Sequence, residues 1–252
     1  MRRRLLALAA AIAVLASPGS GRAQDSAPRD PTASTFSILG YDPETGEIGV
    51  AVQSLVFSVG NGVIWGQAGV GVVATQAVAN IGYGPRALDL LQDGLEPDEV
   101  VRRLLEEDPD PFPESWPKTG RQVAVMDASG RAAAWTGPEA PDWAGHSTGA
   151  SVSVQGNLLM GPTVLGAMLN AFRETPGHLA LRLVAALDAA QAAGGDRRGM
   201  QSAAILVVRE GGGPWLGNDV ELRLQVDDNT RPLVELRRLV ELAISQRSAA
   251  RD

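Results

Sequence analysis

The chain has 252 residues, of which 44% are hydrophobic and 20% are charged, and its formal net charge is −7. It contains no cysteine, which excludes disulfides, thiolate metal sites and a cysteine nucleophile, and its two histidines argue against a histidine-rich metal centre. The acidic balance and the aromatic content of 4% argue against nucleic-acid binding. We therefore expect no metal and no cofactor, and a small molecule rather than a nucleic acid as the partner.

The amino terminus has the pattern of a secretory signal peptide. Three arginines open the chain, an apolar run from Leu5 to Ala16 follows them, and small residues lead up to Ala23. The apolar run is shorter than the ~20 residues that a membrane-spanning helix needs. We assign residues 1–23 to a signal peptide and residues 24–34 to a flexible leader. The mature protein is expected in the periplasm or outside the cell, with no membrane span.

Alternating apolar and polar residues, bounded by turn residues, predict the strands in chain order. Thr35–Tyr41 and Glu47–Ser54 flank a turn-rich loop at 42–46 and are predicted to form a hairpin. The further predicted strands are Val63–Gln67, Val70–Ala77, Arg121–Met126, Arg131–Thr136, Ser151–Gln155, Ser202–Arg209 and Val220–Val226.

Helical periodicity predicts helices between these strand groups. The predicted helices are Pro85–Gln92, Pro97–Glu107, Pro162–Arg173, His178–Ala193 and Leu233–Ile244. Because strand groups alternate with helix pairs rather than with single helices, a doubly wound parallel sheet fits poorly. We predict one α+β domain over residues 35–252, in which two mainly antiparallel sheets lie between helical layers.

Two segments repeat the pattern Asn-x3-Gly-Pro between a strand and a helix. The first begins at Asn80 and the second at Asn157. An asparagine at such a position satisfies a local turn, or it presents its amide to a ligand beside a helix N-terminus. Both interpretations stay open, and we include Asn80 and Asn157 among the candidate catalytic residues.

A serine next to a histidine lies in the segment 145–149, which matches G-x-S-x-G. A serine hydrolase that uses Ser147 and His146 is therefore one hypothesis. That motif needs a strand before it and a helix after it, and here a proline-containing segment precedes it and a strand follows. The context disfavours Ser147 as a nucleophile.

Thr35 is the stronger candidate nucleophile, because it opens the first strand directly after the polar leader. An N-terminal threonine combines nucleophile and base, since its free α-amine accepts the proton of the hydroxyl. The hairpin partner of this strand ends at Ser54, which we include in the candidate catalytic set. This chemistry needs neither cysteine nor histidine, in agreement with the composition.

Other polar residues are candidates for binding the substrate. Gln76 and Gln155 follow apolar strand residues and either face a shared cleft or pair with neighbouring backbone. Asp196 and Arg197 lie in a glycine-rich turn, where an arginine can hold an anionic group, although a solvated loop explains them equally well. His146 is either a general acid or a packing residue.

Short segments along the whole chain form an ordered series. They are TFSI from Thr35, DPETGEIGVAV from Asp42, AGVG from Ala68, VATQA from Val73, YGP from Tyr83, WAGH from Trp143, VQGN from Val154, GGDRRG from Gly194, QSAA from Gln201, VDD from Val226 and ELRRL from Glu235. The series resembles the bacterial family called domain of unknown function 1028. The resemblance implies an N-terminal-nucleophile hydrolase-like fold, a four-layer αββα sandwich, and it implies no substrate. Gln201 lies in one of the matching segments and joins the substrate-binding candidates.

One difference from that family concerns the start of the chain. Typical members begin with Met directly before the matching threonine, whereas 34 residues precede Thr35 here. A second cut after Ser34 is required to free the Thr35 amine. With that cut, we expect an exported hydrolase of non-peptide C–N bonds such as amides. Without it, the expected alternative is a catalytically silent protein that binds a small ligand. The expected substrate is a small molecule, and an anionic group on it is one option. The sequence also leaves open whether the protein forms a homo-oligomer.

Overall fold

Two antiparallel sheets form the centre of the computed structural model, which describes residues 35–196 and 198–249. Within these residues, one sheet has six strands in the order β10-β9-β2-β1-β8-β7, and the other has four in the order β3-β4-β5-β6. The strands are β1 (Thr35–Tyr41), β2 (Ile48–Ser54), β3 (Ile64–Gln67), β4 (Gly71–Ala77), β5 (Arg121–Asp127), β6 (Ala132–Thr136), β7 (Gly145–Gly149), β8 (Val152–Asn157), β9 (Ser202–Val208) and β10 (Val220–Val226).

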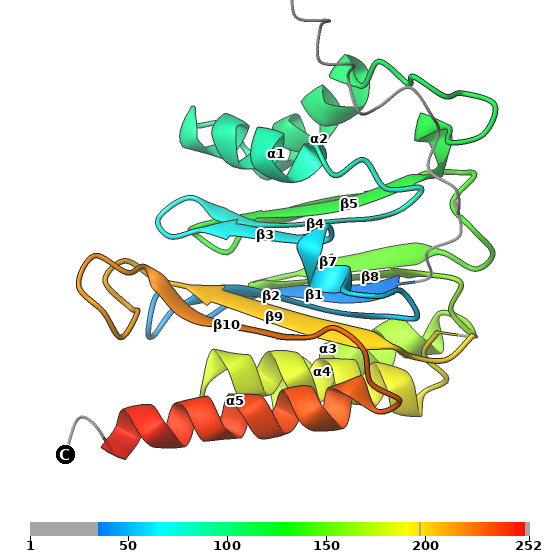
Figure 1. The fold of residues 1–252 in the computed structure, drawn as a ribbon. Helices are drawn as coiled ribbons and strands as arrows, with labels where there is room; N and C mark the ends of the chain where they lie inside the picture. Colours follow the sequence, from blue (N-terminus) through cyan, green and yellow to red (C-terminus); the bar gives the residue numbers. More distant parts are fainter. Residues whose placement is uncertain (1–34, 197, 250–252) are drawn as a thin grey trace, which may run out of the picture.

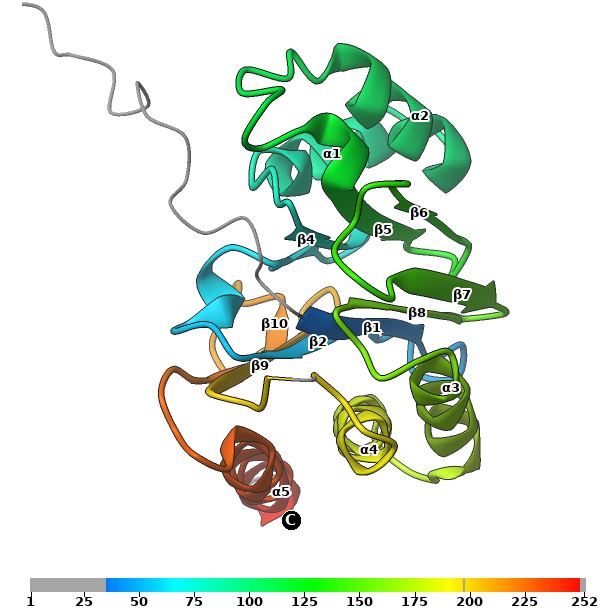
Figure 2. The ribbon, with the colours of Figure 1, turned by 90° about the vertical axis from the view of Figure 1, so that its right-hand side faces the viewer.

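Helices cover the outer face of each sheet. The helices are α1 (Tyr83–Gln92), α2 (Pro97–Glu107), α3 (Thr163–Glu174), α4 (Leu179–Ala192) and α5 (Pro232–Ala249). The first two lie on the four-stranded sheet and the other three on the six-stranded sheet (Figures 1 and 2). The mixed α and β content with two antiparallel sheets, predicted from the alternation of strand groups and helix pairs, is confirmed.

The apolar residues form three cores that follow these layers. Alternate residues of β1 enter different cores: Phe36 and Ile38 pack with the helices below the six-stranded sheet, whereas Leu39 packs between the two sheets. Because side chains on a strand point to opposite faces in turn, Thr35 and Ser37 share the inter-sheet face with Leu39. Polar residues at the start of β1 are thereby buried between the sheets.

Small residues let the helices approach the β1–β2 hairpin closely. A Cβ atom at Gly40 would lie 2.7 Å from the ring of Phe172 on α3, and one at Gly49 would lie 2.8 Å from Leu183 on α4. Both distances are shorter than real Cβ atoms tolerate. Glycine is therefore required at these positions for the observed packing.

The structure contains one strand that the sequence analysis did not predict, β7. Its sequence, GHSTG, lacks the apolar residues by which strands are recognised. It forms because each of its residues pairs with β8, from Gly145 opposite Gly156 to Gly149 opposite Val152. The last helix also extends further than predicted, to Ala249.

Several predictions about the chain ends fall outside the described residues. The signal peptide, residues 1–23, and the leader, residues 24–34, belong to the part that the structure does not describe. Within residues 35–196 and 198–249, every helix is too short or too polar to cross a membrane.

Candidate functional site

Thr35 is the first residue of an interior strand of the six-stranded sheet. It pairs with Ser54 at the end of β2 on one side and with Asn157 at the end of β8 on the other. Its side chain is buried, and its hydroxyl donates a hydrogen bond to Ser54 Oγ at 3.2 Å. Three of the predicted catalytic residues, Thr35, Ser54 and Asn157, are therefore adjacent.

Two side-chain amides hold the main chain of Thr35. Gln76 Nε2, from β4 of the other sheet, donates to the Thr35 carbonyl oxygen at 3.2 Å, and Asn157 Nδ2 donates to the same oxygen at 3.4 Å. The two donors come from different sheets, so the contact joins the sheets at the start of β1. The arrangement fixes the backbone of the residue that carries the hydroxyl.

These amides belong to a larger buried set that we call the amide cluster: Ser37, Gln76, Gln122, Gln155 and Asn157. Ser37 Oγ donates to Gln76 Oε1 at 2.6 Å and accepts from Gln155 Nε2 at 2.6 Å. Gln122 Oε1 accepts from Gln76 Nε2 at 2.8 Å and from Asn157 Nδ2 at 3.3 Å. The cluster has no charged member, so its amide groups hold one another by neutral hydrogen bonds between the sheets.

Gln122 is the residue at the centre of the cluster, and the sequence analysis missed it. Its Nε2 lies within 3.0 Å of the carbonyl oxygens of Gly145 and Gly156 and 2.9 Å from Thr136 Oγ1. The available signal was a glutamine directly before the apolar run of β5, and in the structure it lies opposite Gln76 in the register of β4 and β5. A polar residue at a buried strand position needs partners, and the pairing with Gln76 supplies one.

His146 lies at the edge of the amide cluster. Its Nδ1 is 2.8 Å from Thr136 Oγ1, and Thr136 in turn contacts Gln122. Partial desolvation beside the sheets lowers the pKa of His146 below its usual value, although the residue is exposed on one side. In the structure it is connected to Thr35 only through the intervening amides.

An apolar cavity of about 170 Å³ lies beside Thr35. Thr35, Ser58 and Gln76 are its polar lining residues, and every other lining residue is apolar or glycine. Two of the residues that line it, Ser58 and Ala77, have positive φ angles of 56° and 64°. Side chains with Cβ atoms rarely adopt this conformation, and such strain concentrates at functional sites.

Two other predicted site residues, Asp196 and Gln201, lie near the same end of the sheet as Ser54. Asp196 is buried and accepts a hydrogen bond from the backbone N–H of Leu55, next to Ser54, and it is paired with Arg198 at 3.2 Å. Gln201 pairs its backbone N–H with the Ser54 carbonyl, while its side chain contacts Asp228. Arg197 lies outside the described residues.

Asn80, the fourth predicted catalytic residue, makes a different set of contacts from Asn157. Its Oδ1 accepts from the backbone N–H of Gly82, and its Nδ2 donates to Asp108 at 3.2 Å. Burial raises the pKa of Asp108, but hydrogen bonds from Tyr83 and Asn80 and the charge of Arg121 outweigh it, so the net pKa is lowered. The two Asn-x3-Gly-Pro segments thus differ: Asn80 satisfies a loop and Asn157 contacts Thr35.

The structure separates the serine and histidine of the G-x-S-x-G match. Both lie on β7, where His146 pairs with Gln155 and Ser147 with Val154. Neighbouring residues on a strand point to opposite faces, so His146 faces the amide cluster and Ser147 faces away from it. The segment also continues into the β7–β8 hairpin rather than into a helix, and the geometry of a nucleophile elbow is not formed.

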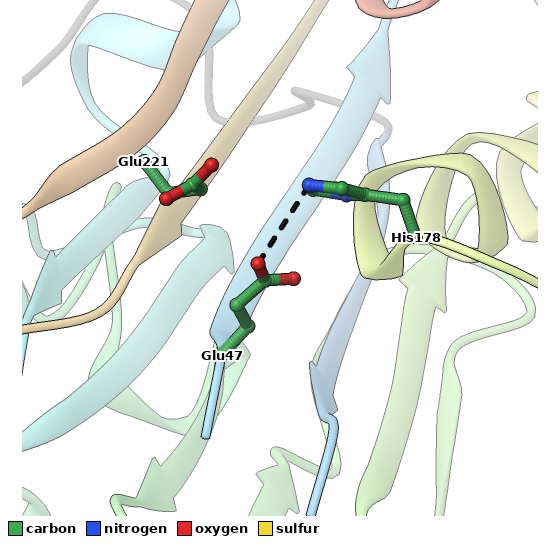
Figure 3. Close-up of side chains that lie close together, drawn as sticks. All are labelled: Glu47, His178 and Glu221. Atoms are coloured by element: carbon green, nitrogen blue, oxygen red, sulfur yellow. Dashed lines mark ion pairs between the residues drawn. The ribbon is translucent and has the colours of Figure 1, made fainter. Parts of the chain in front are cut away.

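A second, charged cluster lies at the opposite end of the β1–β2 hairpin. Figure 3 shows Glu47, His178 and Glu221 converging from the start of β2, the N-terminus of α4 and β10, with 3.7 Å between His178 Nε2 and Glu47 Oε1. A cavity of about 370 Å³ adjoins them and is also lined by Arg209 and Arg247. Burial is the main cause that raises the pKa of Glu47.

This charged cluster is the one group in the described residues with ligands spaced for a metal ion, but its hydrogen bonds suit an ion-pair network. His178 Nδ1 accepts the backbone N–H of Ala180 as a helix cap, which leaves the proton of the neutral ring on Nε2. A metal would need the lone pair of that nitrogen. Glu221 is already paired with Arg209 at 3.2 Å and with Arg247.

Together, the fold and the site define a mixed α and β protein with two stacked antiparallel sheets and an uncharged hydroxyl-and-amide site at the start of an interior strand. The chain belongs to the family of unknown function DUF1028, whose family model matches residues 35–236. It is similar to the crystal structure of protein SPO2555 from Silicibacter pomeroyi, which carries the same family model. The two are 36% identical with a TM-score of 0.73, over 83% of this chain and 89% of that chain. No curated protein matches the chain.

Proposed function

We propose that this protein is an exported hydrolase of non-peptide C–N bonds in amides, with Thr35 as an N-terminal nucleophile. One observation carries the proposal: a buried threonine hydroxyl at the start of an interior strand, 3.2 Å from Ser54 Oγ, lines a cavity. The family match begins at the same residue, Thr35, which supports a removable segment before it. The order of layers in Figure 1 supports an N-terminal-nucleophile hydrolase-like fold.

The reaction needs the Thr35 amine to be free. Thr35 Oγ1 attacks the carbonyl carbon of the amide while the α-amine, with a pKa near 8, accepts the hydroxyl proton. The amine then donates this proton to the leaving nitrogen, the C–N bond breaks, and the acyl group stays on Thr35 as an ester. Water hydrolyses the ester to a carboxylic acid and regenerates the hydroxyl.

The amide cluster positions the nucleophile in this scheme. Gln76 and Asn157 both donate to the Thr35 carbonyl oxygen and so fix the orientation of its main chain. A nucleophile that is already oriented loses less entropy when it attacks, which is a major source of rate enhancement. Gln76 and Asn157 are positioning residues in this scheme, because they contact Thr35.

A ligand-binding protein without turnover is the second candidate. It is favoured by one fact of the sequence: in the full chain the Thr35 nitrogen forms the peptide bond with Ser34 and has no free lone pair to act as base. In that case the cavity and the amide cluster bind a ligand, and no acyl-enzyme forms.

A library of small amides, incubated with the protein purified from an exporting host, tests the proposal. Wild type is expected to release amine from at least one member, with an ester-linked acyl adduct on the Thr35 peptide in trapped samples. Thr35→Ala is expected to lose turnover by about 10⁴-fold or more, while Thr35→Ser retains part of it. Turnover that survives in Thr35→Ala would refute the proposed nucleophile.

A further inference from the structure

We propose that the cavity beside Thr35 receives an uncharged, apolar acyl group of about four to six carbon atoms from the substrate amide. This inference rests on the proposed function, because it assigns the acyl side of the amide to the space next to the Thr35 hydroxyl. The assignment follows from the size, the lining and the electrostatic surroundings of the cavity.

The size of the cavity limits the acyl group. Its volume is about 170 Å³. A cavity of about 150 Å³ lined by aliphatic and aromatic side chains stays dry and binds benzene, so this space accommodates a group of similar size. A long fatty acyl chain or a sugar exceeds the space.

The lining of the cavity selects an apolar group. Apolar side chains surround it from the β2–η1 connection, from η1 (Val59–Asn61), from the η1–β3 connection and from the segment after β4: Val56, Phe57, Val59, Val63, Ala79 and Ile81. Phe57 and Ile81 are largely exposed, so the apolar surface continues from the interior to the outside. An apolar group that moves from water into such a lining gains free energy with each methylene that it buries.

The surroundings disfavour an anionic acyl group. None of the residues that line the cavity is charged. The lining residue Ser58 donates the hydrogen bond of its hydroxyl to the carboxylate of Asp227 at 2.5 Å. A carboxylate on the acyl group would lose its water among lining side chains of which none is cationic. An anionic group on the substrate therefore belongs to the amine side of the scissile bond.

Two of the lining residues have strained backbone conformations. Ser58, at φ 56°, directs its hydroxyl to Asp227, and Ala77, at φ 64°, follows Gln76 of the amide cluster. The lining combines three polar residues, Thr35, Ser58 and Gln76, with apolar residues and a glycine. A neutral amide with an apolar acyl group matches this lining. Its carbonyl would lie next to the Thr35 hydroxyl, and its hydrocarbon part would contact the apolar side chains.

The test titrates a series of carboxamides into the purified protein and measures dissociation constants by NMR. The probes are acetamide, butanamide, pentanamide, 4-methylpentanamide and decanamide, with succinamate as the anionic counterpart of the middle members. Affinity is expected to rise about fourfold per methylene up to the size of 4-methylpentanamide and to stop rising beyond it. Succinamate is expected to bind at least 100-fold more weakly than pentanamide.

Two variants localise the binding. Ala79→Met puts a larger side chain into the cavity wall and is expected to abolish the gain from the added methylenes. Ala150→Met makes the same change at an exposed turn and is expected to leave the series unchanged. If Ala79→Met fails to fold by circular dichroism, Val63→Thr places a hydroxyl in the wall and is expected to weaken pentanamide several-fold.

The same experiments separate the cavity assignment from the hydrolase proposal. Wild type that binds the series with the expected dependence on acyl size, but releases no amine from any member, refutes only the hydrolase. Equal affinity across the series, preference for succinamate, or no saturable binding overturns the cavity assignment. Hydrolysis of amides with charged acyl groups, lost in Thr35→Ala, overturns the cavity assignment and keeps the nucleophile.

Discussion

The two ends of the β1–β2 hairpin bury polar groups in opposite ways. At the Thr35 end, hydroxyls and amides bind one another and no member of the amide cluster carries a charge. At the turn end, Glu47 and Glu221 meet His178 and two arginines. A neutral site can be fully buried at low cost if its hydrogen bonds are made, whereas the buried carboxylates of Glu47 and Glu221 need cationic partners to offset the cost of burying charge. The hairpin thereby keeps a desolvated nucleophile apart from its charged residues.

The pH dependence of turnover gives the largest expected difference between the two ends. If the Thr35 amine is the base, kcat/KM falls about tenfold per pH unit below a pKa near 8, because only the neutral amine accepts a proton. Initial rates between pH 5 and 9 measure it. Glu47→Gln, at the charged end, is expected to give the same profile. A profile that shifts with Glu47→Gln would show that the charged end takes part in the reaction.

Gln122→Leu is expected to have the next largest effect, because it disrupts the amide cluster at the Thr35 end of the hairpin. It removes the partner of two amides and leaves the carbonyl groups of Gly145 and Gly156 buried without their donor. We expect the free energy of unfolding to fall by about 2–4 kcal/mol, measured by urea denaturation. A change below about 0.5 kcal/mol, which is the range of a neutral surface substitution, would mean that the amide cluster does not stabilise the fold.

Gln53→Leu is the substitution matched to Gln122→Leu, but it is expected to raise the free energy of unfolding instead of lowering it. Gln53 is as buried as Gln122, but neither of its side-chain polar atoms has a hydrogen-bond partner among the residues that the structure describes. Leucine removes two unsatisfied groups, so we expect a gain of about 1–2 kcal/mol in the same urea experiment. A loss of stability in Gln53→Leu would indicate that the glutamine has a partner, such as a bound water.

Glu47→Gln sharpens the comparison at the charged end. Burial raises the folded-state pKa of Glu47 above its ordinary value of 4.5, and Glu221 and Asp42 add to this effect, while His178 and Arg209 oppose it. A raised pKa means that Glu47 stabilises the fold below pH 4.5 and loses this contribution as the pH rises through its folded-state pKa. Relative to wild type, Glu47→Gln is therefore expected to become more stable with increasing pH from 4.5 to 7. Thermal melts of both proteins over this pH range measure the difference in stability. If Glu47→Gln instead became less stable relative to wild type as the pH rises, the raised pKa of Glu47 would be contradicted.

Arg247→Met gives the smallest expected effect. Arg247 is partly exposed and pairs with the buried Glu221, which keeps Arg209 as a second partner at 3.2 Å, so the substitution leaves no unpaired buried charge. The stability difference from wild type is expected to be below about 1 kcal/mol at low salt and to shrink at high salt. A difference that is independent of salt would assign the effect to packing of the arginine stem.

The sequence predicted the sheets and helices well because their apolar residues recur with clear periods. The same periodicity explains why β7 was missed, since Gly145–Gly149 has no apolar pattern and forms through pairing with β8. Thr35, Ser54 and Asn157 were predicted as one site because each lies at a strand end. Gln122 was not predicted, because its role depends on the register of β4 and β5, which the sequence of either strand does not contain.

The identity of the amino-terminal residue tests the central claim most directly. The protein is expressed in an exporting host, purified from the compartment to which it is delivered, and analysed by N-terminal sequencing and intact mass. The account predicts Thr35 as the first residue, which frees the amine that the proposed reaction needs. A protein that begins at Gln24, and keeps that end on prolonged incubation, would contradict Thr35 as an N-terminal nucleophile.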